Sequence, residues 1–397
     1  MSQDHLSRRT VLRSGTGLAA AVLLAGCGSS SDSSDQPTDQ PTSPSGPASP
    51  SPTAATGYAM PAERLPHERT FMAWPALTEV WGDQLPAVRQ DIVHVAQAIA
   101  QYEPVVLMAR PDQSDDAQQQ LGDTVEVIAL PVDDLWARDT GPTFVTGPQG
   151  LAGVDFNFNG WGNKQTHAND SLVARNLLAK YGIRRFQASI VTEGGAIEVD
   201  GQGTLMATES SMVNPNRNPG KTRDQIESEL KAMLGVTKVI WFQGVIGQDI
   251  TDCHIDALAR FVEPGVVALH RPGPGTPPDI WSRASDQALQ VLSTATDAQG
   301  HSLRVVDLIE PDFDKITGTG SDFLATYLNY YVCNGAVIMP VFGDQSADDA
   351  AAATLGDLHP GRDIVRVTIN AIAAGGGGIH CSTQQQPQLA GASSSPS

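Results

Sequence analysis

Short runs of apolar, largely β-branched residues recur along the chain and restrict the folds that it can adopt. Runs of four or five such residues are typical of buried strands, whereas longer amphipathic stretches are typical of helices. The strand-like runs are at residues 104–108, 125–128, 236–240, 265–269, 336–339 and 364–367, and the helix-like stretches at 84–101, 170–180, 222–234 and 282–296. This pattern predicts one mixed α/β domain, which we place at residues 57–387.

Four unusual polar motifs accompany these runs, and each follows or ends a strand-like run. They are centred on Asp139, Glu193, His254 and Cys381, which lie 54, 61 and 127 positions apart. A ring of similar units, each delivering a loop to a common axis, would give this spacing. Two ordinary α/β halves could do the same.

The two ends of the chain differ in composition from the folded part. Residues 1–27 contain the pair Arg8 and Arg9, an apolar stretch too short to span a bilayer, and a Leu-Ala-Gly-Cys sequence that ends at Cys27. This segment resembles a twin-arginine lipoprotein signal peptide, so we expect export, lipidation of Cys27 and anchoring at the extracellular face of the cell membrane. A plain secreted protein would need no cysteine there. Residues 28–56 are expected to form a disordered linker and residues 388–397 a disordered tail.

Charge narrows the range of partners. The formal net charge is −19, and residues 1–26 contribute +2 from three arginines and one aspartate, so the processed chain carries −19 − 2 = −21. Such an acidic body repels nucleic acid and attracts small cations, although excess acid also keeps an extracellular protein soluble. We expect no nucleic-acid partner and membrane contact only through the lipid anchor; a homo-oligomer is left open.

Cysteine usage points to a reactive thiol and away from a disulfide scaffold. Once Cys27 is set aside, the folded part contains Cys253, Cys333 and Cys381. An odd number in an oxidising compartment implies at least one unpaired thiol. The spacings fit no C-x-x-C zinc site, and no other array of metal ligands is apparent. We therefore expect no metal.

The segment before Cys381 contains four consecutive glycines, at residues 375–378, followed by Ile-His-Cys. Glycines allow backbone conformations closed to other residues and let a loop approach a ligand closely. The loop could instead be a hinge or lie beside a phosphate, but a phosphate loop would carry a lysine, and none follows. We interpret Cys381 as a candidate nucleophile.

A histidine between acidic residues forms the second motif, Asp252-Cys253-His254-Ile255-Asp256. On an extended strand, His254 and Asp256 would point to the same face. A general acid/base beside a carboxylate is what a cysteine nucleophile requires. An isolated histidine is more often structural, but this one has an acid on each side.

Two further motifs place single acids at turns: Trp136-Ala-Arg-Asp139-Thr-Gly-Pro and Thr-Glu193-Gly-Gly. Taken alone, each acid would be interpreted as a helix cap or a turn residue. Together with His254 and Cys381, they suggest a site for a planar cation, because carboxylates bind a guanidinium in a forked geometry. A cysteine amidase would instead need donors for an oxyanion, which carboxylates oppose.

These four motifs together resemble the agmatine deiminase and Porphyromonas-type peptidylarginine deiminase family of the guanidino-group-modifying superfamily. Residues 60–63, 72–75, 160–164 and 329–344 also resemble that family, so the likeness covers about residues 58–387. It implies a pentein fold, a five-bladed α/β propeller of ββαβ units with pseudo-fivefold symmetry.

The resemblance also implies roles for individual residues. Cys381 would be the nucleophile, His254 the acid/base and Glu193 its support, while Asp139 and Asp256 grip the guanidinium. Trp136, Trp161 and Asp252 are further candidates for substrate binding. The implied reaction converts agmatine to N-carbamoylputrescine and ammonia through a covalent thiouronium, without a metal or organic cofactor.

Two departures from the family pattern are Cys253 and Asn163, where glycine is usual, and Cys253 puts substrate preference in doubt. Arginine within a peptide is the alternative substrate, although no arginine pair near Asp139 or Trp161 suits its carboxylate. A lipid-anchored guanidino-compound-binding protein would fit the ends of the chain, but it would not need Cys381.

Overall fold

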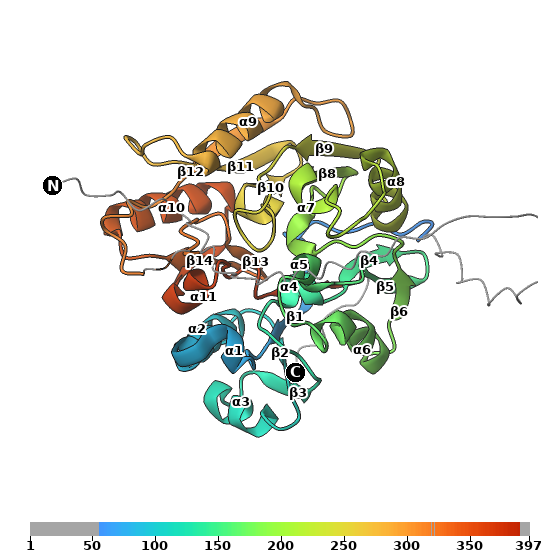
Figure 1. Ribbon diagram of the computed structural model, residues 1–397, viewed down its shortest axis with the longest axis vertical. Coiled ribbons are helices and arrows are strands. Elements are labelled where there is room, and N and C mark those ends of the chain that lie inside the picture. The colour runs from blue at the N-terminus through green and yellow to red at the C-terminus, as the bar shows by residue number, and fades with distance from the viewer. Residues whose placement is uncertain (1–54, 319, 321, 390–397) are drawn as a thin grey trace, which may run out of the picture.

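The computed structural model describes residues 55–318, 320 and 322–389, whose strands form five small sheets (Figure 1). The strand orders are β16-β1-β2-β3, β4-β5-β6, β7-β8-β9, β10-β11-β12 and β13-β14-β15. The strands are β1 (His67–Ala73), β2 (Val105–Ala109), β3 (Glu126–Ala129), β4 (Thr143–Gly147), β5 (Gly150–Asp155), β6 (Arg184–Gln187), β7 (Glu198–Val199), β8 (Thr204–Thr208), β9 (Lys238–Phe242), β10 (Ala259–Glu263), β11 (Val266–Arg271), β12 (Arg304–Ile309), β13 (Tyr331–Cys333), β14 (Ala336–Val341), β15 (Asp363–Thr368) and β16 (Gln384–Pro387).

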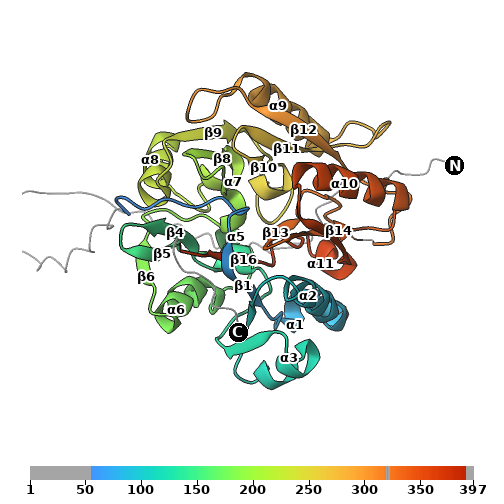
Figure 2. The ribbon, with the colours of Figure 1, turned by 180° about the vertical axis from the view of Figure 1, so that it is seen from behind.

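The sheets share one pattern of pairing. Each has one antiparallel pair, as between β10 and β11, which is extended by one parallel strand, as β12 extends β11, or by two in the first sheet, where β2 and β3 follow β1. The first sheet joins the two ends of the folded chain, because β16 pairs antiparallel with β1 and aligns Phe71 with Gln384. This pairing brings the loop before β16 into the middle of the molecule (Figure 2).

A helix connects each pair of parallel neighbours, as parallel pairing requires a crossover. The longer helices are α2 (Leu85–Ile99), α3 (Ser114–Leu121), α6 (Val173–Lys180), α8 (Arg223–Leu234), α9 (Ile280–Thr294) and α10 (Gln345–Leu358). The short ones are α1 (Thr78–Trp81), α4 (Ala137–Thr140), α5 (Gly160–Asn163), α7 (Glu209–Met212) and α11 (Asn370–Ala374), with 3-10 turns η1 (Gly82–Gln84), η2 (Asp170–Leu172), η3 (Gly194–Ala196) and η4 (Ile255–Ala257). The longer helices lie around the outside in both views (Figures 1 and 2), and α4 and α5 lie near the middle of Figure 1.

Local sequence signals explain where the predicted helices begin and end. Thr222 and Gln225 form a reciprocal capping box at the start of α8, and Gly235 ends it in the left-handed conformation. Asp279 and Ser282 form a capping box of the same kind at the start of α9. This helix therefore begins at Ile280, two residues before the predicted start at residue 282. The mixed α/β class and all six predicted strands are confirmed, with bounds displaced by one or two residues.

Ala55, which we assigned to the linker from composition, packs on the domain. Ala55 is buried, and its carbonyl accepts a hydrogen bond from Tyr58 N at 2.9 Å. Tyr58 packs edge-on against Phe186, which holds this first segment on the domain. The predicted signal peptide with Cys27, the linker up to residue 54 and the tail from residue 390 lie outside the described residues. Within the described part, no helix has the length and apolar character needed to cross a membrane.

Candidate active site

The loop that carries Cys381 is built on close contacts of its glycines. A Cβ atom on Gly377 would lie 2.1 Å from the Trp136 ring, and one on Gly378 would lie 2.5 Å from Asn329 Oδ1. Gly376 has a φ of 84°, which L side chains rarely adopt. The glycine run therefore provides close packing at two positions and backbone freedom at a third.

Cys381 is partly buried and has polar neighbours on several sides. Asn329 Nδ2 donates to Sγ at 3.2 Å, and Cys381 N donates to Asn329 Oδ1 at 3.3 Å. Sγ also lies 3.6 Å from Asp256 Oδ2. Burial, followed by the carboxylates of Asp256 and Asp139, raises the pKa of the Cys381 thiol well above its ordinary value. The free protein therefore holds a neutral thiol at neutral pH.

His254 lies between two of the predicted acids. Its Nε2 is 3.3 Å from Glu193 Oε2, and its Nδ1 is 3.8 Å from Asp139 Oδ2. Burial lowers the pKa of His254, but Asp139, Glu193 and Asp256 together outweigh burial and raise it to about 9. The imidazole is therefore positively charged at neutral pH.

The motif around His254 is a turn, so the expectation of an extended strand was wrong. Asp252 and Cys253 have φ values of 60° and 69°, and Asp256 lies in the 3-10 turn η4. Two consecutive left-handed residues reverse the chain, which prevents strand pairing here. Cys253 occupies a conformation that favours glycine, at a cost of about 1–2 kcal/mol, but it buries its side chain in an apolar cluster.

Asp139 and Asp256 approach His254 around a single glycine. Gly195 N donates to Asp139 Oδ1 at 2.9 Å. A Cβ on Gly195 would lie 2.6 Å from His254 Nδ1 and 3.0 Å from an oxygen of each aspartate. Burial is the main cause of a raised pKa at Asp139, whereas at Asp256 burial is outweighed by His380, His254 and Arg260, which lower the pKa. The sequence indicated only a turn at Gly195, and its central position emerges from the fold.

Glu193 connects the site to a buried ion-pair cluster that includes Asp252. Arg217 Nε donates to Glu193 Oε1 at 2.9 Å, and its Nη1 donates to Asp252 Oδ2 at 2.6 Å. Lys164 Nζ also donates to Asp252 Oδ2, at 2.6 Å. Burial raises the pKa of Glu193, but Arg217 and His254 outweigh it and lower the pKa. Asp252 is thus paired with both Arg217 and Lys164, and Arg217 also orients Glu193.

Both predicted tryptophans are buried beside the site. Trp161 Nε1 donates to Asp139 Oδ2 at 2.9 Å. Trp136 packs under Gly377, and its Nε1 donates to Asp134 Oδ2 at 3.1 Å. Asp134 Oδ1 accepts a second indole N–H, from Trp81 at 2.7 Å. One carboxylate therefore holds two aromatic rings behind the Cys381 loop.

Several supporting residues were missed from the sequence. His380 Nδ1 lies 2.8 Å from Asp256 Oδ2, and its Nε2 lies 2.8 Å from Glu63 Oε2. Glu63 Oε1 is paired with Arg260 Nη2 at 2.9 Å, and Glu63 Oε2 with Arg138 Nη2 at 3.3 Å. Burial raises the pKa of Glu63, but Arg260, His380 and Arg138 hold it well below its ordinary value. The position of His380 beside Cys381 was one available signal, and the likeness of residues 60–63 to the family was another, although it gave Glu63 no role.

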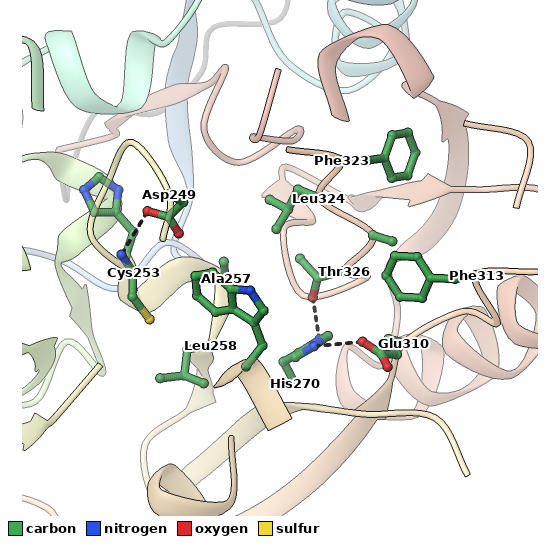
Figure 3. Close-up of a pocket in the computed structure, with 13 residues that line it drawn as sticks. Asp249, Cys253, Ala257, Leu258, His270, Glu310, Phe313, Phe323, Leu324 and Thr326 are labelled. Atoms are coloured by element: carbon green, nitrogen blue, oxygen red, sulfur yellow. Dashed lines mark hydrogen bonds and ion pairs between the residues drawn. The ribbon is translucent and has the colours of Figure 1, made fainter. Parts of the chain in front are cut away.

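A cavity of about 60 Å³ begins beside His254, and Figure 3 shows its lining. Asp249 and Cys253 lie on one side of the lining, and Glu310 and His270 lie on the other. The lining also includes the apolar residues Phe313, Phe323, Leu324, Ala257, Leu258 and Trp281. Among residues 55–318, 320 and 322–389, no group of three His, Cys, Asp or Glu side chains could hold a metal ion.

The fold and the site define a class: a mixed α/β enzyme in which a thiol, a charged imidazole and buried carboxylates surround one point. A family model for Porphyromonas-type peptidyl-arginine deiminases matches residues 59–387. The agmatine deiminase of Medicago truncatula is 38% identical over 365 residues, which span 84% of this chain and 97% of the relative. The agmatine deiminase of Stutzerimonas stutzeri is 38% identical over 355 residues, spanning 83% and 96% of the two chains.

Solved structures agree with these relatives. The agmatine deiminase of Enterococcus faecalis matches with a TM-score of 0.78 at 33% identity, covering 84% of this chain and 96% of that one. The chain belongs to the agmatine deiminase and Porphyromonas-type peptidyl-arginine deiminase family. It is a hydrolase that acts on carbon–nitrogen bonds.

Proposed function

We propose that this chain hydrolyses agmatine to N-carbamoylputrescine and ammonia, with Cys381 as the nucleophile. The observation that carries the proposal is the convergence of one thiol with Asp139, Asp256 and a protonated His254. The Sγ atom of Cys381 lies 3.6 Å from Asp256 Oδ2. Asp139, Asp256 and His254 all lie close to Gly195. A buried group of carboxylates stabilises a cation and disfavours an anionic or neutral acyl substrate.

Substrate binding changes the charge around the sulfur. Asp139 and Asp256 grip the guanidinium through its forked N–H groups. The same carboxylates raise the pKa of the free Cys381 thiol, so a cation placed between them reverses their effect and allows the thiol to lose its proton to water. Trp136 and Trp161 form walls of this site, and Asp252 acts through Arg217 and Glu193.

The first chemical step forms a carbon–sulfur bond and breaks a carbon–nitrogen bond. The thiolate of Cys381 attacks the guanidinium carbon to give a tetrahedral adduct. His254, held protonated by Glu193 and Asp139, donates its proton to one nitrogen, which leaves as ammonia. A thiouronium bound to Cys381 remains.

The second step returns the enzyme to its starting state. The imidazole of His254, now neutral, takes a proton from a water molecule that attacks the thiouronium carbon. Collapse of this second tetrahedral adduct breaks the carbon–sulfur bond, and the proton of its hydroxyl group passes to the departing sulfur, which releases the ureido product and restores the neutral thiol.

Incubation of the purified protein with agmatine, arginine and an arginyl peptide tests the proposal. We expect ammonia and a ureido product in equal amounts from agmatine, and neither from the Cys381→Ser variant. Cys333→Ser is the matched control, because Cys333 is a buried thiol on β13, and it should keep full activity. Product from the peptide alone would favour peptidylarginine, and no product from any substrate would contradict the proposal.

We also propose that the five sheets are the blades of a closed propeller with pseudo-fivefold symmetry. Four of them repeat the order ββαβ, and the first sheet unites strands from both ends of the chain. Superposition of each sheet, with its crossover helix, onto the next by successive rotations about one axis tests this. Rotations that fail to return to the first sheet would contradict it.

The N-terminal segment is proposed to export and anchor the enzyme. Support comes from the twin arginines and the Leu-Ala-Gly-Cys sequence at Cys27. Metabolic labelling with a radioactive fatty acid should mark the full-length protein in cells and leave the Cys27→Ala variant unlabelled. Equal labelling of both would contradict lipidation at this residue.

A further inference from the structure

A second, smaller cavity reaches Asp139, one of the two aspartates proposed to hold the guanidinium. Its volume of about 10 Å³ is room for about one water molecule and is too small for an organic ligand. Within the described part of the chain it shares no lining residue with the cavity beside His254, so the two are separate spaces. The polar residues of its lining are Asp139, Thr140, Thr143, Asp155, Ser171 and Thr192.

Two buried threonines of this lining have hydroxyl groups that form no hydrogen bond with the described residues. Thr140 and Thr192 are each 1% exposed, and the Oγ1 atom of each is without a partner. A buried hydroxyl that lacks a partner is costly, whereas an ordered water supplies the hydrogen bond at a modest cost in entropy. Waters bound in protein interiors occupy small polar spaces of this kind.

The two hydroxyls belong to segments that meet at the active site. Thr140 directly follows Asp139 and is the last residue of α4, while Thr192 lies three positions before Gly195. Gly195 N already joins these segments through its hydrogen bond to Asp139 Oδ1 at 2.9 Å. A water held between the two hydroxyls would join the same segments a second time.

Of the two carboxylates in the lining, Asp139 is the one with less compensation for its charge. Asp155 Oδ2 is paired with Arg185 Nε at 2.8 Å. Among the described residues, the hydrogen bonds that Asp139 accepts come from the neutral N–H groups of Gly195 and Trp161, and His254 Nδ1 is 3.8 Å away. Burial raises the pKa of Asp139, and each further hydrogen bond that its carboxylate accepts favours the ionised form that a guanidinium requires.

We propose that this cavity binds one water molecule, which the hydroxyls of Thr140 and Thr192 hold and which donates a hydrogen bond to the carboxylate of Asp139. Both hydroxyls donate to the water oxygen, so the hydrogens of the water remain free to donate. Thr140 and Thr192 are then positioning residues, because they act through the water and Asp139. The water site is independent of the reaction, whereas its effect on catalysis rests on the proposed function.

A high-resolution crystal structure of the unmodified full chain tests the site without any substrate. We expect one ordered water within hydrogen-bond distance of Thr140 Oγ1, Thr192 Oγ1 and an oxygen of Asp139. The double variant Thr140→Val with Thr192→Val keeps the shape of both side chains, and this water should be absent from it. An unmodified protein without a water at this place overturns the inference, and so does a water that contacts neither hydroxyl or does not reach Asp139.

Kinetics separate the effect of the hydroxyls from that of packing. Thr140→Val with Thr192→Val should lower kcat/KM for agmatine by about 10-fold, the size expected when a charged group loses one hydrogen bond. Thr140→Ser with Thr192→Ser keeps both hydroxyls and should retain most of the activity. A packing role predicts the reverse order, because valine fills the space of threonine and serine does not, and that order would overturn the role of the water.

Thr354→Val is the matched control, because Thr354 is on α10, outside the lining of this cavity, and bonds to Ala350 O within its own helix. It should leave kcat/KM unchanged. Ammonia release by the unmodified chain is assayed separately. Its absence contradicts the proposed function, while the crystal structure still decides whether the water is bound.

Discussion

At the residue scale, the site is a balance of buried charges. Asp139, Glu193 and Asp256 together keep His254 protonated, while the carboxylates of Asp139 and Asp256 keep the Cys381 thiol neutral until a cation arrives. Groups with strongly shifted pKa values that share one small space are typical of catalytic sites. The same arrangement makes the reaction depend on pH through His254.

We predict that kcat/KM for agmatine falls as the pH rises above about 9. The pKa of His254 is raised to about 9, so the imidazole is protonated below that pH and loses the proton needed by the leaving ammonia above it. Glu193→Gln removes one cause of the raised pKa, so the alkaline limb should move to lower pH. Initial rates of ammonia release measured across the pH range check this, and an unmoved limb would contradict the role of Glu193.

Gly195→Ala is predicted to lower kcat/KM by at least about 100-fold, because a displacement of about 1 Å at reacting groups can reduce the rate this much. The added Cβ would lie 2.6 Å from His254 Nδ1, so the imidazole or its partners must shift. Steady-state kinetics with circular dichroism separate this effect from unfolding. A folded variant with an unaltered rate would show that the spacing around Gly195 is not critical.

At the element scale, the Cys381 loop is held from behind by two tryptophans that share Asp134. A Cβ atom on Gly375 would lie 2.2 Å from the Trp81 ring, and a Cβ atom on Gly377 would lie 2.1 Å from the Trp136 ring. Burial raises the pKa of Asp134. The hydrogen bonds that its carboxylate accepts from Trp81, Leu135 N and other donors lower the pKa, but by less than burial raises it. The loop geometry therefore depends on residues far earlier in the chain: Trp136 precedes Gly377 by 377 − 136 = 241 positions and Trp81 precedes Gly375 by 375 − 81 = 294.

Gly377→Ala is predicted to reduce kcat strongly and to destabilise the fold by about 1–3 kcal/mol, because the new methyl group overlaps Trp136. Gly356→Ala is the matched control: Gly356 lies within α10, and its Cβ would be 3.8 Å from the nearest atom. That change should stabilise the protein by about 0.5–1 kcal/mol and leave kcat unchanged. Urea unfolding and kinetics measure both, and equal behaviour of the two variants would contradict the packing role of Gly377.

Local elements could be predicted from the sequence more fully than the site could. Residues 336–339 were recognisable as a strand because β14 is buried at almost every position, and Thr222 marked the start of α8. The turn at His254 was missed because it depends on left-handed Asp252 and Cys253, which composition does not reveal. The partners of Asp252 were also missed, since Arg217 reaches it only in the folded chain.

At the scale of the whole molecule, Glu63 joins distant parts of the chain. It accepts hydrogen bonds from Val332 N on β13 and from Arg138, and it is paired with Arg260 and His380. The first segment, the middle sheets and the final loop therefore meet at one buried carboxylate. Such long-range contacts could not be predicted because the residues involved are separated by up to 317 positions.

Glu63→Gln is predicted to lower the free energy of unfolding by about 3–5 kcal/mol, since it leaves buried cations without their counter-charge. Glu68→Gln is the matched control: Glu68 is partly exposed and pairs near the surface with Arg69, so its loss should change stability by less than about 0.5 kcal/mol. Urea denaturation of both variants gives the comparison. A decrease in the free energy of unfolding that is equally small in both variants would show that the contacts of Glu63 do not stabilise the domain.

The covalent bond between Cys381 and the substrate carbon is tested most directly by acid-quenching the protein during turnover of agmatine and measuring its intact mass. We predict an increase equal to agmatine minus ammonia, located on the peptide that contains Cys381 and absent from Cys381→Ser. Steady production of ureido product with no such adduct, or an adduct on another residue, would contradict the mechanism.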